Sequence, residues 1–288
     1  MSPFVALQYL LPKRLLTEAA GRFARAQGGW VTQAAIARFI RRYNVNMAEA
    51  AQADIRQYRS FNEFFTRALK PGARPLADTA YVCPVDGAIS QFGAIARDQI
   101  FQAKGHHYST RALVGGDAAL AEQFDDGAFA TIYLSPRDYH RIHMPSAGVL
   151  RRMIHVPGEL FSVNPVTAQG VPGLFARNER VVCVFDVPHG PDGATRLFVL
   201  VLVGATIVGS MATSWHGVVN PPRPGRVREW TYDGSAPAHR LHKGDEMGRF
   251  LLGSTVVMLW PRDTIRFNPD WAPARAVRLG EAMGEALS

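Results

Sequence analysis

Cysteine is scarce in this chain of 288 residues, which contains only Cys83 and Cys183. Neither a disulfide framework nor a cysteine zinc site follows from two cysteines so far apart, and a reducing compartment is indicated. Acidic residues are also few, 24 against 32 Lys and Arg, so the net charge is +8. Such a charge favours anionic partners, either nucleic acid or an acidic lipid surface. Because 47% of the residues are hydrophobic and 19% are charged, we expect a globular protein.

Several signature motifs are absent. The sequence has no G-x-S-x-G elbow, P-loop or G-x-G-x-x-G fingerprint, which weakens hydrolase, nucleotide and dinucleotide interpretations. No nucleic-acid-binding module accompanies the positive charge, so no nucleic-acid partner is predicted. His140 and His143 resemble half of a metal site, but no H-E-x-x-H or cysteine pair completes it, and no metal is predicted. The first 26 residues mix basic and apolar residues, unlike a secretory signal.

One uncharged stretch, Leu197 to Trp215, reaches the length of a transmembrane helix with 19 residues. It is rich in Val, Ile and Thr, however, and Gly204 and Gly209 interrupt it. β-branched residues favour strands, so the stretch predicts two buried strands around a bend, with a spanning helix as the alternative.

The chain divides into two parts of different pattern. Up to about residue 69, apolar residues recur at helical spacing, beginning with Leu7, Leu10, Leu11 and Leu15. Residues 1–43 hold seven Lys or Arg and one Glu, a pattern typical of a helix on a membrane surface. The alternative is a helical cap with its basic face in water. After a turn at 71–75, apolar segments at 129–136, 148–156, 180–187 and 254–260 alternate with Gly and Pro, as in a sandwich or barrel.

Three segments carry the candidate chemical residues. "CPVDGAIS" places Asp86 in a turn before a strand, and "SPRDYHRIHMP" holds His140 and His143. "RFLLGSTVV" interrupts an apolar run with Gly253 and Ser254, which indicates either a bulge or a reactive peptide bond. A histidine base needs a carboxylate to orient its ring, and Asp86 could supply it.

Three motifs together resemble the bacterial phosphatidylserine decarboxylases: "PVDGAIS" (84–90), "YLSPRDYHRIHMP" (133–145) and "KGDEMGRFLLGST" (243–255). The resemblance implies an α+β fold, with N-terminal amphipathic helices and a β-rich catalytic domain related to barrel-sandwich hybrids. The expected domains are a membrane-associating helical region at 1–70 and the catalytic domain at 71–288.

The resemblance also implies a self-processing enzyme. The proenzyme would cut itself between Gly253 and Ser254 into a large chain (1–253) and a small chain (254–288) that stay associated. Ser254 would become a covalent pyruvoyl cofactor, with Asp86 and His143 as its charge-relay partners. The pyruvoyl carbonyl would form a Schiff base with phosphatidylserine and yield phosphatidylethanolamine and CO2. His140 would contact the substrate or protonate the product.

A lipid substrate implies a location at the bilayer. We therefore expect a peripheral protein on the cytoplasmic side of the cell membrane. It would bind an anionic surface through the apolar side chains of Leu7, Leu10, Leu11 and Leu15 and through the cations Lys13, Arg14, Arg22 and Arg25. A homodimer of the processed unit is compatible with the resemblance, which does not fix the oligomeric state.

Two functions from other classes stay open at this point. The segment "KGDEMG" also resembles lipoyl- or biotinyl-carrier hybrid domains, with Lys243 as the modified residue. A serine hydrolase would use Ser254, His143 and Asp86 as its triad. Only the decarboxylase predicts two chains on a denaturing gel.

Overall fold

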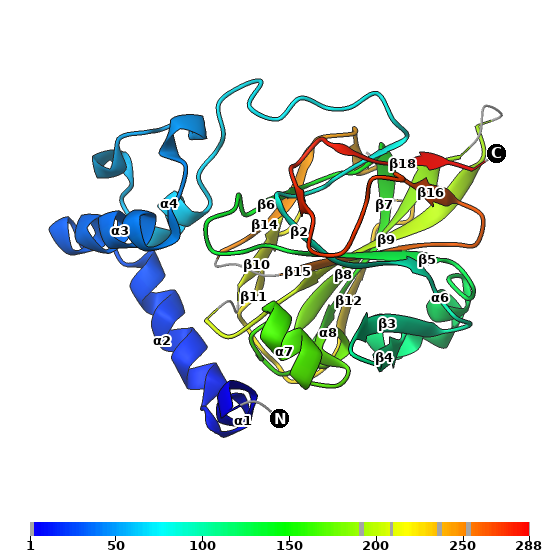
Figure 1. The fold of residues 1–288 in the computed structure, drawn as a ribbon, viewed down its shortest axis with the longest axis horizontal. Coiled ribbons are helices and arrows are strands. Elements are labelled where there is room, and N and C mark those ends of the chain that lie inside the picture. The colour runs from blue at the N-terminus through cyan, green and yellow to red at the C-terminus, as the bar shows by residue number, and fades with distance from the viewer. Residues whose placement is uncertain (1–2, 190–192, 208–209, 235–237, 252–254, 288) are drawn as a thin grey trace.

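A computed structural model describes residues 3–189, 193–207, 210–234, 238–251 and 255–287. Leu252, Gly253 and Ser254 lie outside the described residues. Figure 1 shows a group of helices on one side of a larger β-rich body.

The N-terminal part is helical, as its periodicity predicts. It contains α1 (Pro3–Leu10), α2 (Lys13–Arg25), α3 (Trp30–Tyr43) and α4 (Phe61–Phe65), with two short 3-10 turns at Met47–Glu49 and Ile55–Gln57. Asn44 ends α3 in the left-handed conformation, and the Ser60 hydroxyl caps the first turn of α4. A small core of its own holds this part together, made of Ala24, Ile36, Val45, Tyr58, Phe61, Phe64 and Phe65.

The largest sheet is antiparallel and contains most of the long strands. Its order is β12 (Arg228–Thr231), β7 (Gly148–Val156), β8 (Arg180–Pro188), β9 (Thr195–Val203), β15 (Thr255–Trp260), β5 (Ala128–Tyr133), β2 (Gly87–Ala94) and β17 (Ala276–Val277), and β13 (Arg240–Leu241) also pairs with β7. The four apolar segments expected as strands are thus confirmed, within the described residues.

Among the described residues, the β-rich part also contains three smaller sheets. They join β11 (Gly217–Asn220), β10 (Met211–Thr213), β14 (Glu246–Phe250) and β6 (Arg141–His143); β1 (Tyr81–Val82), β18 (Ala282–Ala286) and β16 (Ile265–Phe267); and β3 (Gln99–Ala103) with β4 (His106–Ser109). Four short helices lie among them: α5 (Thr110–Leu113), α6 (Ala118–Glu122), α7 (Pro165–Gly170) and α8 (Leu174–Arg177). The fold is therefore α+β. None of these sheets closes into a barrel in the part of the chain that the structure describes, and the relation to barrel-sandwich hybrids stays a prediction.

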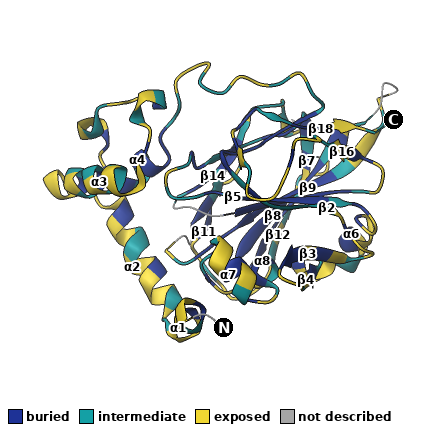
Figure 2. Cartoon of the chain, in the orientation of Figure 1, coloured by how far each residue is buried: buried dark blue, intermediate teal, exposed yellow. Residues whose placement is uncertain are grey.

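The middle of the large sheet is buried on both faces (Figure 2). Along β15, Val256, Met258 and Trp260 belong to one hydrophobic core, while Val257 and Leu259 belong to the core on the opposite face. Strand residues alternate between faces, so a strand between two cores must be apolar at every position. The same reason explains the apolar run of β9, whose residues alternate between the two cores. The uncharged stretch after Leu197 forms β9 and β10, as predicted. Among the described helices, none combines the length and the hydropathy that crossing a bilayer requires.

Candidate active site

The chain on both sides of the Gly-Ser step is held against the segments that carry the predicted site residues. On one side, the Phe250 amide donates to the His140 carbonyl oxygen at 3.0 Å. On the other, Thr255 pairs with Tyr133 in β5, and Tyr133 pairs in turn with Ala88, two residues after Asp86. Three distant motifs therefore meet at one end of the large sheet. Gly253 and Ser254 themselves lie outside the described residues.

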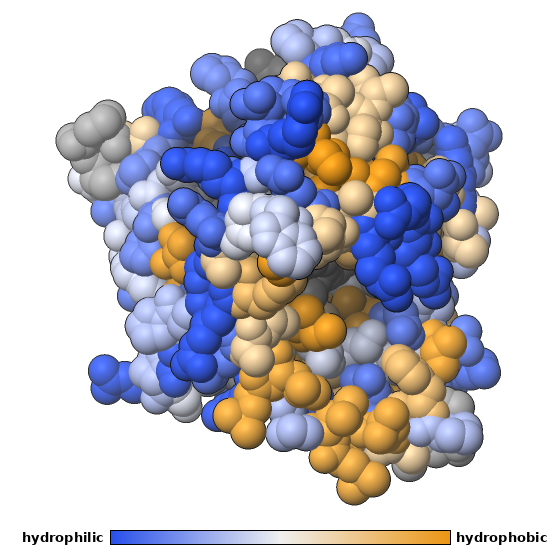
Figure 3. Space-filling view, turned by 90° about the vertical axis from the view of Figure 1, so that its left-hand side faces the viewer, coloured by the Kyte–Doolittle hydropathy of each residue, from blue (hydrophilic) through white to orange (hydrophobic). Residues whose placement is uncertain are grey.

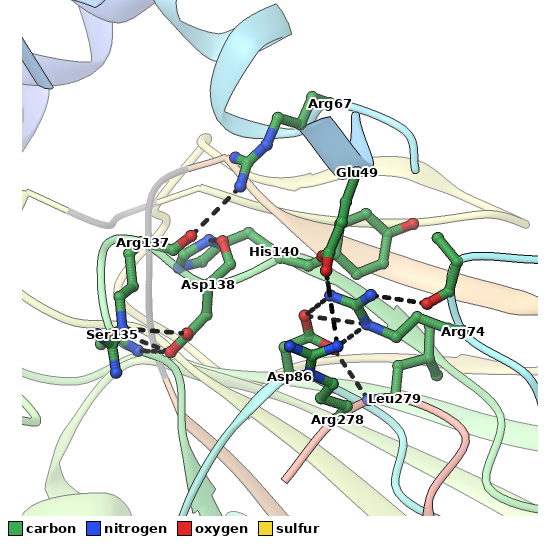
Figure 4. A network of polar contacts seen from close by, with 12 residues as sticks. Glu49, Arg67, Arg74, Asp86, Ser135, Arg137, Asp138, His140, Arg278 and Leu279 are labelled. Atoms are coloured by element: carbon green, nitrogen blue, oxygen red, sulfur yellow. Dashed lines mark hydrogen bonds and ion pairs between the residues drawn. The ribbon is translucent and has the colours of Figure 1, made fainter. Parts of the chain in front are cut away.

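Asp86 is buried, and its carboxylate accepts hydrogen bonds from one guanidinium and one backbone amide (Figure 4). Arg74 Nε lies 2.9 Å from Oδ1, Arg74 Nη2 lies 2.6 Å from Oδ2, and the Leu279 amide donates to Oδ1 at 2.9 Å. Arg74 also contacts the Glu49 carboxylate at 2.7 Å. A bidentate arginine pair is geometrically specific, so Arg74 fixes the orientation of the Asp86 carboxylate.

Gly87 lets β2 come close to β5 directly after Asp86. A Cβ atom on Gly87 would lie 2.4 Å from the Tyr133 carbonyl oxygen, a distance that no side chain tolerates. In the sequence, the Asp86-Gly87 pair is typical of a turn. The structure shows that glycine is also required at position 87 for the close packing of β2 on β5.

His143 is oriented by two groups. Its Nδ1 lies 2.7 Å from the Gly244 carbonyl oxygen, and its Nε2 lies 3.1 Å from the Tyr139 hydroxyl. A carbonyl only accepts, so Nδ1 carries the hydrogen and Nε2 accepts from Tyr139. Burial lowers the pKa of His143 and raises the pKa of Tyr139 to about 12. At neutral pH the site therefore holds an uncharged imidazole with its lone pair on Nε2.

Asp86 and His143 lie on adjacent segments, because the His143 amide donates to the Pro84 carbonyl oxygen at 2.9 Å. None of the hydrogen bonds between the described residues joins their side chains; Asp86 bonds to Arg74 and Leu279, while His143 bonds to Tyr139 and Gly244. The charge relay thus stays a prediction. Sequence reasoning missed Arg74 as the partner of Asp86, because the turn at 71–75 holds no signal for that contact.

His140 is completely buried, with its ring against Phe65 at a centroid distance of 4.1 Å. Its Nδ1 donates to the Asp138 carbonyl oxygen at 2.8 Å, while its Nε2 has no hydrogen-bond partner among the described residues. Burial lowers the pKa of His140 to about 3. His140 is therefore a neutral imidazole whose free nitrogen is an acceptor.

A polar pocket of about 540 Å³ adjoins Asp86. Its lining includes Tyr133 and Ala88, which place it at the same end of the sheet as Thr255. Asp138 also lines it and accepts from the amide and hydroxyl of Ser135, both at 2.7 Å. Burial raises the pKa of Asp138. No cluster of three or more metal-ligating side chains occurs among the residues that the structure describes.

The fold is α+β, and buried titratable side chains lie on the segments next to both flanks of the Gly-Ser step. Residues 61–285 match a family described as phosphatidylserine decarboxylase, and residues 3–44 match one described as PSD. The chain is 71% identical over 282 residues to the phosphatidylserine decarboxylase proenzyme of Methylibium petroleiphilum, covering 98% of this chain and 97% of that protein. It is 70% identical over 277 residues to the proenzyme of Polaromonas sp. strain JS666, covering 96% and 95%. The chain belongs to the phosphatidylserine decarboxylase family.

Proposed function

We propose that the protein converts phosphatidylserine to phosphatidylethanolamine and CO2 in phospholipid synthesis, after cutting its own backbone between Gly253 and Ser254. Family membership supports the decarboxylation, and the word proenzyme in the relatives' names supports a processing step. The observation that carries the proposal is that Phe250 contacts the His140 segment on one flank of the Gly-Ser step, while Thr255 on the other flank pairs with Tyr133, the strand partner of the segment that follows Asp86.

Self-cleavage needs a nucleophile and a base. Ser254 Oγ would attack the Gly253 carbonyl carbon as its proton passes to a base; the Gly253–Ser254 C–N bond would then break, leaving an ester, and the proton would pass on to the released Ser254 amine. Loss of the Ser254 α-proton would then expel the Gly253 carboxylate and leave dehydroalanine, which water converts to a pyruvoyl group and ammonia. His143 suits the role of base because its Nε2 is unprotonated, and the Tyr139 hydroxyl on that nitrogen would carry the proton.

The residues present fit a pyruvoyl group at position 254. Two buried polar atoms on the flanking segments, His140 Nε2 and Thr255 Oγ1, have no hydrogen-bond partner among the described residues. Buried polar atoms normally are hydrogen-bonded, so each of these two atoms is available to a polar ligand group. A pyruvoyl carbonyl would supply the electron sink for loss of CO2. Of the two roles expected for His140, substrate contact is favoured, because Nε2 accepts and is not protonated at neutral pH.

We further propose that the helices at 1–70 bind the membrane and that 71–288 is the catalytic domain. Leu10 is 82% exposed and Leu15 is 68% exposed, and Phe4 and Leu7 are exposed beside them. Figure 3 views the molecule from the side on which the N-terminal helices lie. Hydrophobic side chains gather at the lower part of that view, where Figure 1 places α1 and the start of α2. Burying such a patch in a bilayer interface would hold the protein peripherally on the cytoplasmic side of the cell membrane.

The cations expected beside this patch divide into two kinds. Arg14, Arg22 and Arg25 are exposed and suit an anionic lipid surface. Lys13 does not, and the expectation is wrong for this residue: its Nζ donates to the Gln8 carbonyl oxygen at 2.9 Å and lies 3.4 Å from the Glu159 carboxylate. Lys13 therefore fastens the helices to the β-rich part.

An intact-mass measurement and a denaturing gel of the purified protein test this function. We expect two chains, of 253 and 35 residues, with the small chain blocked to Edman degradation. Ser254→Ala should stay as one chain and release no CO2 from phosphatidylserine. A single wild-type chain would contradict the proposal and favour a carrier domain or a serine hydrolase, and a small chain with a free N-terminal serine would refute the pyruvoyl group.

A further inference from the structure

Arg67 is a buried cation in the pocket beside Asp86. It follows α4, and only 5% of the residue is exposed. Figure 4 shows its guanidinium pointing toward Arg137 and His140. Its one hydrogen bond in the described structure runs from Nη2 to the Arg137 carbonyl oxygen at 3.3 Å, and its Nε has no partner there. Three or more of its five N–H groups are thus available to a ligand.

The other arginines that line this pocket each have a carboxylate within 4.0 Å. Arg74 lies 2.6 Å from Asp86, Arg278 lies 3.6 Å from Glu49, and Arg137 lies 3.9 Å from Asp138. Among the described residues, Arg67 has no such partner, and burial lowers its pKa. A buried charge without a counterion is costly, so it indicates a site at which a charged ligand supplies the counterion.

The acidic residues of the pocket do not cancel this charge. Four arginines line it (Arg67, Arg74, Arg137 and Arg278) against three carboxylates (Glu49, Asp86 and Asp138), which leaves an excess positive charge. Arg74 contacts both Glu49 and Asp86, and Ser135 donates twice to Asp138. The unmatched cation is therefore Arg67.

We propose that Arg67 binds the phosphodiester of the phosphatidylserine head group. This inference rests on the proposed function. The pocket lies beside Tyr133, which pairs with the first residue after the Gly-Ser step, so a head group reacting at that step would reach the pocket. A guanidinium presents a planar fork of donors that matches phosphate oxygens.

The substrate carries two anions, and their chemistry separates them. The carboxylate loses its charge as CO2 leaves, so an arginine on it would stabilise the ground state more than the transition state and slow the reaction. The phosphodiester keeps its charge throughout, so an arginine on it contributes equally to substrate and transition-state binding. Such uniform binding lowers KM without raising kcat.

The test is Arg67→Met in the full-length, processed protein, assayed with phosphatidylserine in detergent micelles. We expect KM to rise about 10- to 100-fold, because this is the usual contribution of a charge-assisted hydrogen bond to binding, and kcat to change little. Glycerophosphoethanolamine, which has the phosphodiester and no carboxylate, should inhibit the wild type, and its inhibition constant should rise by the same factor in the variant. Free serine, which has the carboxylate and no phosphate, should inhibit both proteins equally.

Two further variants serve as controls. Arg137→Met removes a charge from the same pocket, but its side chain is 64% exposed, so KM should change less than about fivefold. Arg67→Lys should recover part of the affinity. A gel confirms that each protein is cut.

Several results would overturn the proposal: an unchanged KM, a loss of kcat with KM unchanged, or weaker inhibition by serine and not by glycerophosphoethanolamine. Uncut precursor in both Arg67 variants would also overturn it, because Arg67 would then serve maturation. Failure of the proposed function is a separate outcome, since the wild type would then make no phosphatidylethanolamine.

Discussion

Acid should destabilise this protein through His140, by an amount that follows from its burial. The pKa of its imidazole is about 3 in the folded protein and 6.5 in an exposed chain. As the pH falls below 6.5, the unfolded state binds a proton that the folded state does not, so stability is lost. Each pH unit in this window is worth 1.36 kcal/mol, so lowering the pH from 7 to 5 should cost about 2 kcal/mol from this group alone.

The assay compares His140→Phe with its parent, both carrying Ser254→Ala so that each is one chain. Phenylalanine keeps a ring against Phe65 but cannot titrate. Urea unfolding at pH 7 and pH 5, followed by tryptophan fluorescence and by circular dichroism, should show a larger loss in the parent, by about 2 kcal/mol or a midpoint shift of roughly 0.7–1 M. The other titrating groups cancel in this difference. Equal pH dependence in the two proteins would show that His140 is solvated. It would also refute the argument that His140 Nε2 is an unprotonated acceptor.

The relay and the membrane contact yield two more predictions. Asp86→Asn and His143→Ala should both accumulate uncut precursor on a gel, because each removes part of the proposed proton path; normal cleavage in both would remove them from maturation. In liposome flotation, the double variant Leu10→Ser, Leu15→Ser should bind neutral and anionic vesicles more weakly than the parent. The triple variant Arg14→Gln, Arg22→Gln, Arg25→Gln should bind only phosphatidylserine vesicles more weakly, because each cation near an acidic leaflet contributes about 1 kcal/mol of binding free energy. If all these variants float like the parent, the helices are only a cap.

The features that could be predicted from the sequence are those that depend only on residues close together in the chain. The spacing of Leu7, Leu10 and Leu15 predicts helices, and the uniformly apolar β-branched run after Leu197 predicts a buried strand, because periodicity follows from local geometry. The motifs around Asp86, His143 and the Gly-Ser step likewise identify the family through residue order alone, and the family comparison confirms it.

Tertiary structure alone decided which groups meet. His143 bonds to Gly244, 101 residues away, and Leu279 donates to Asp86 across 193 residues. Lys13 reads as one more surface cation in its helix, yet Glu159 lies beside it once α2 packs on the β-rich part. Arg67 reads as an ordinary charge after a helix and becomes a buried, unmatched cation. Burial and counterions are properties of packing between segments distant in the chain, so local sequence carries no record of them.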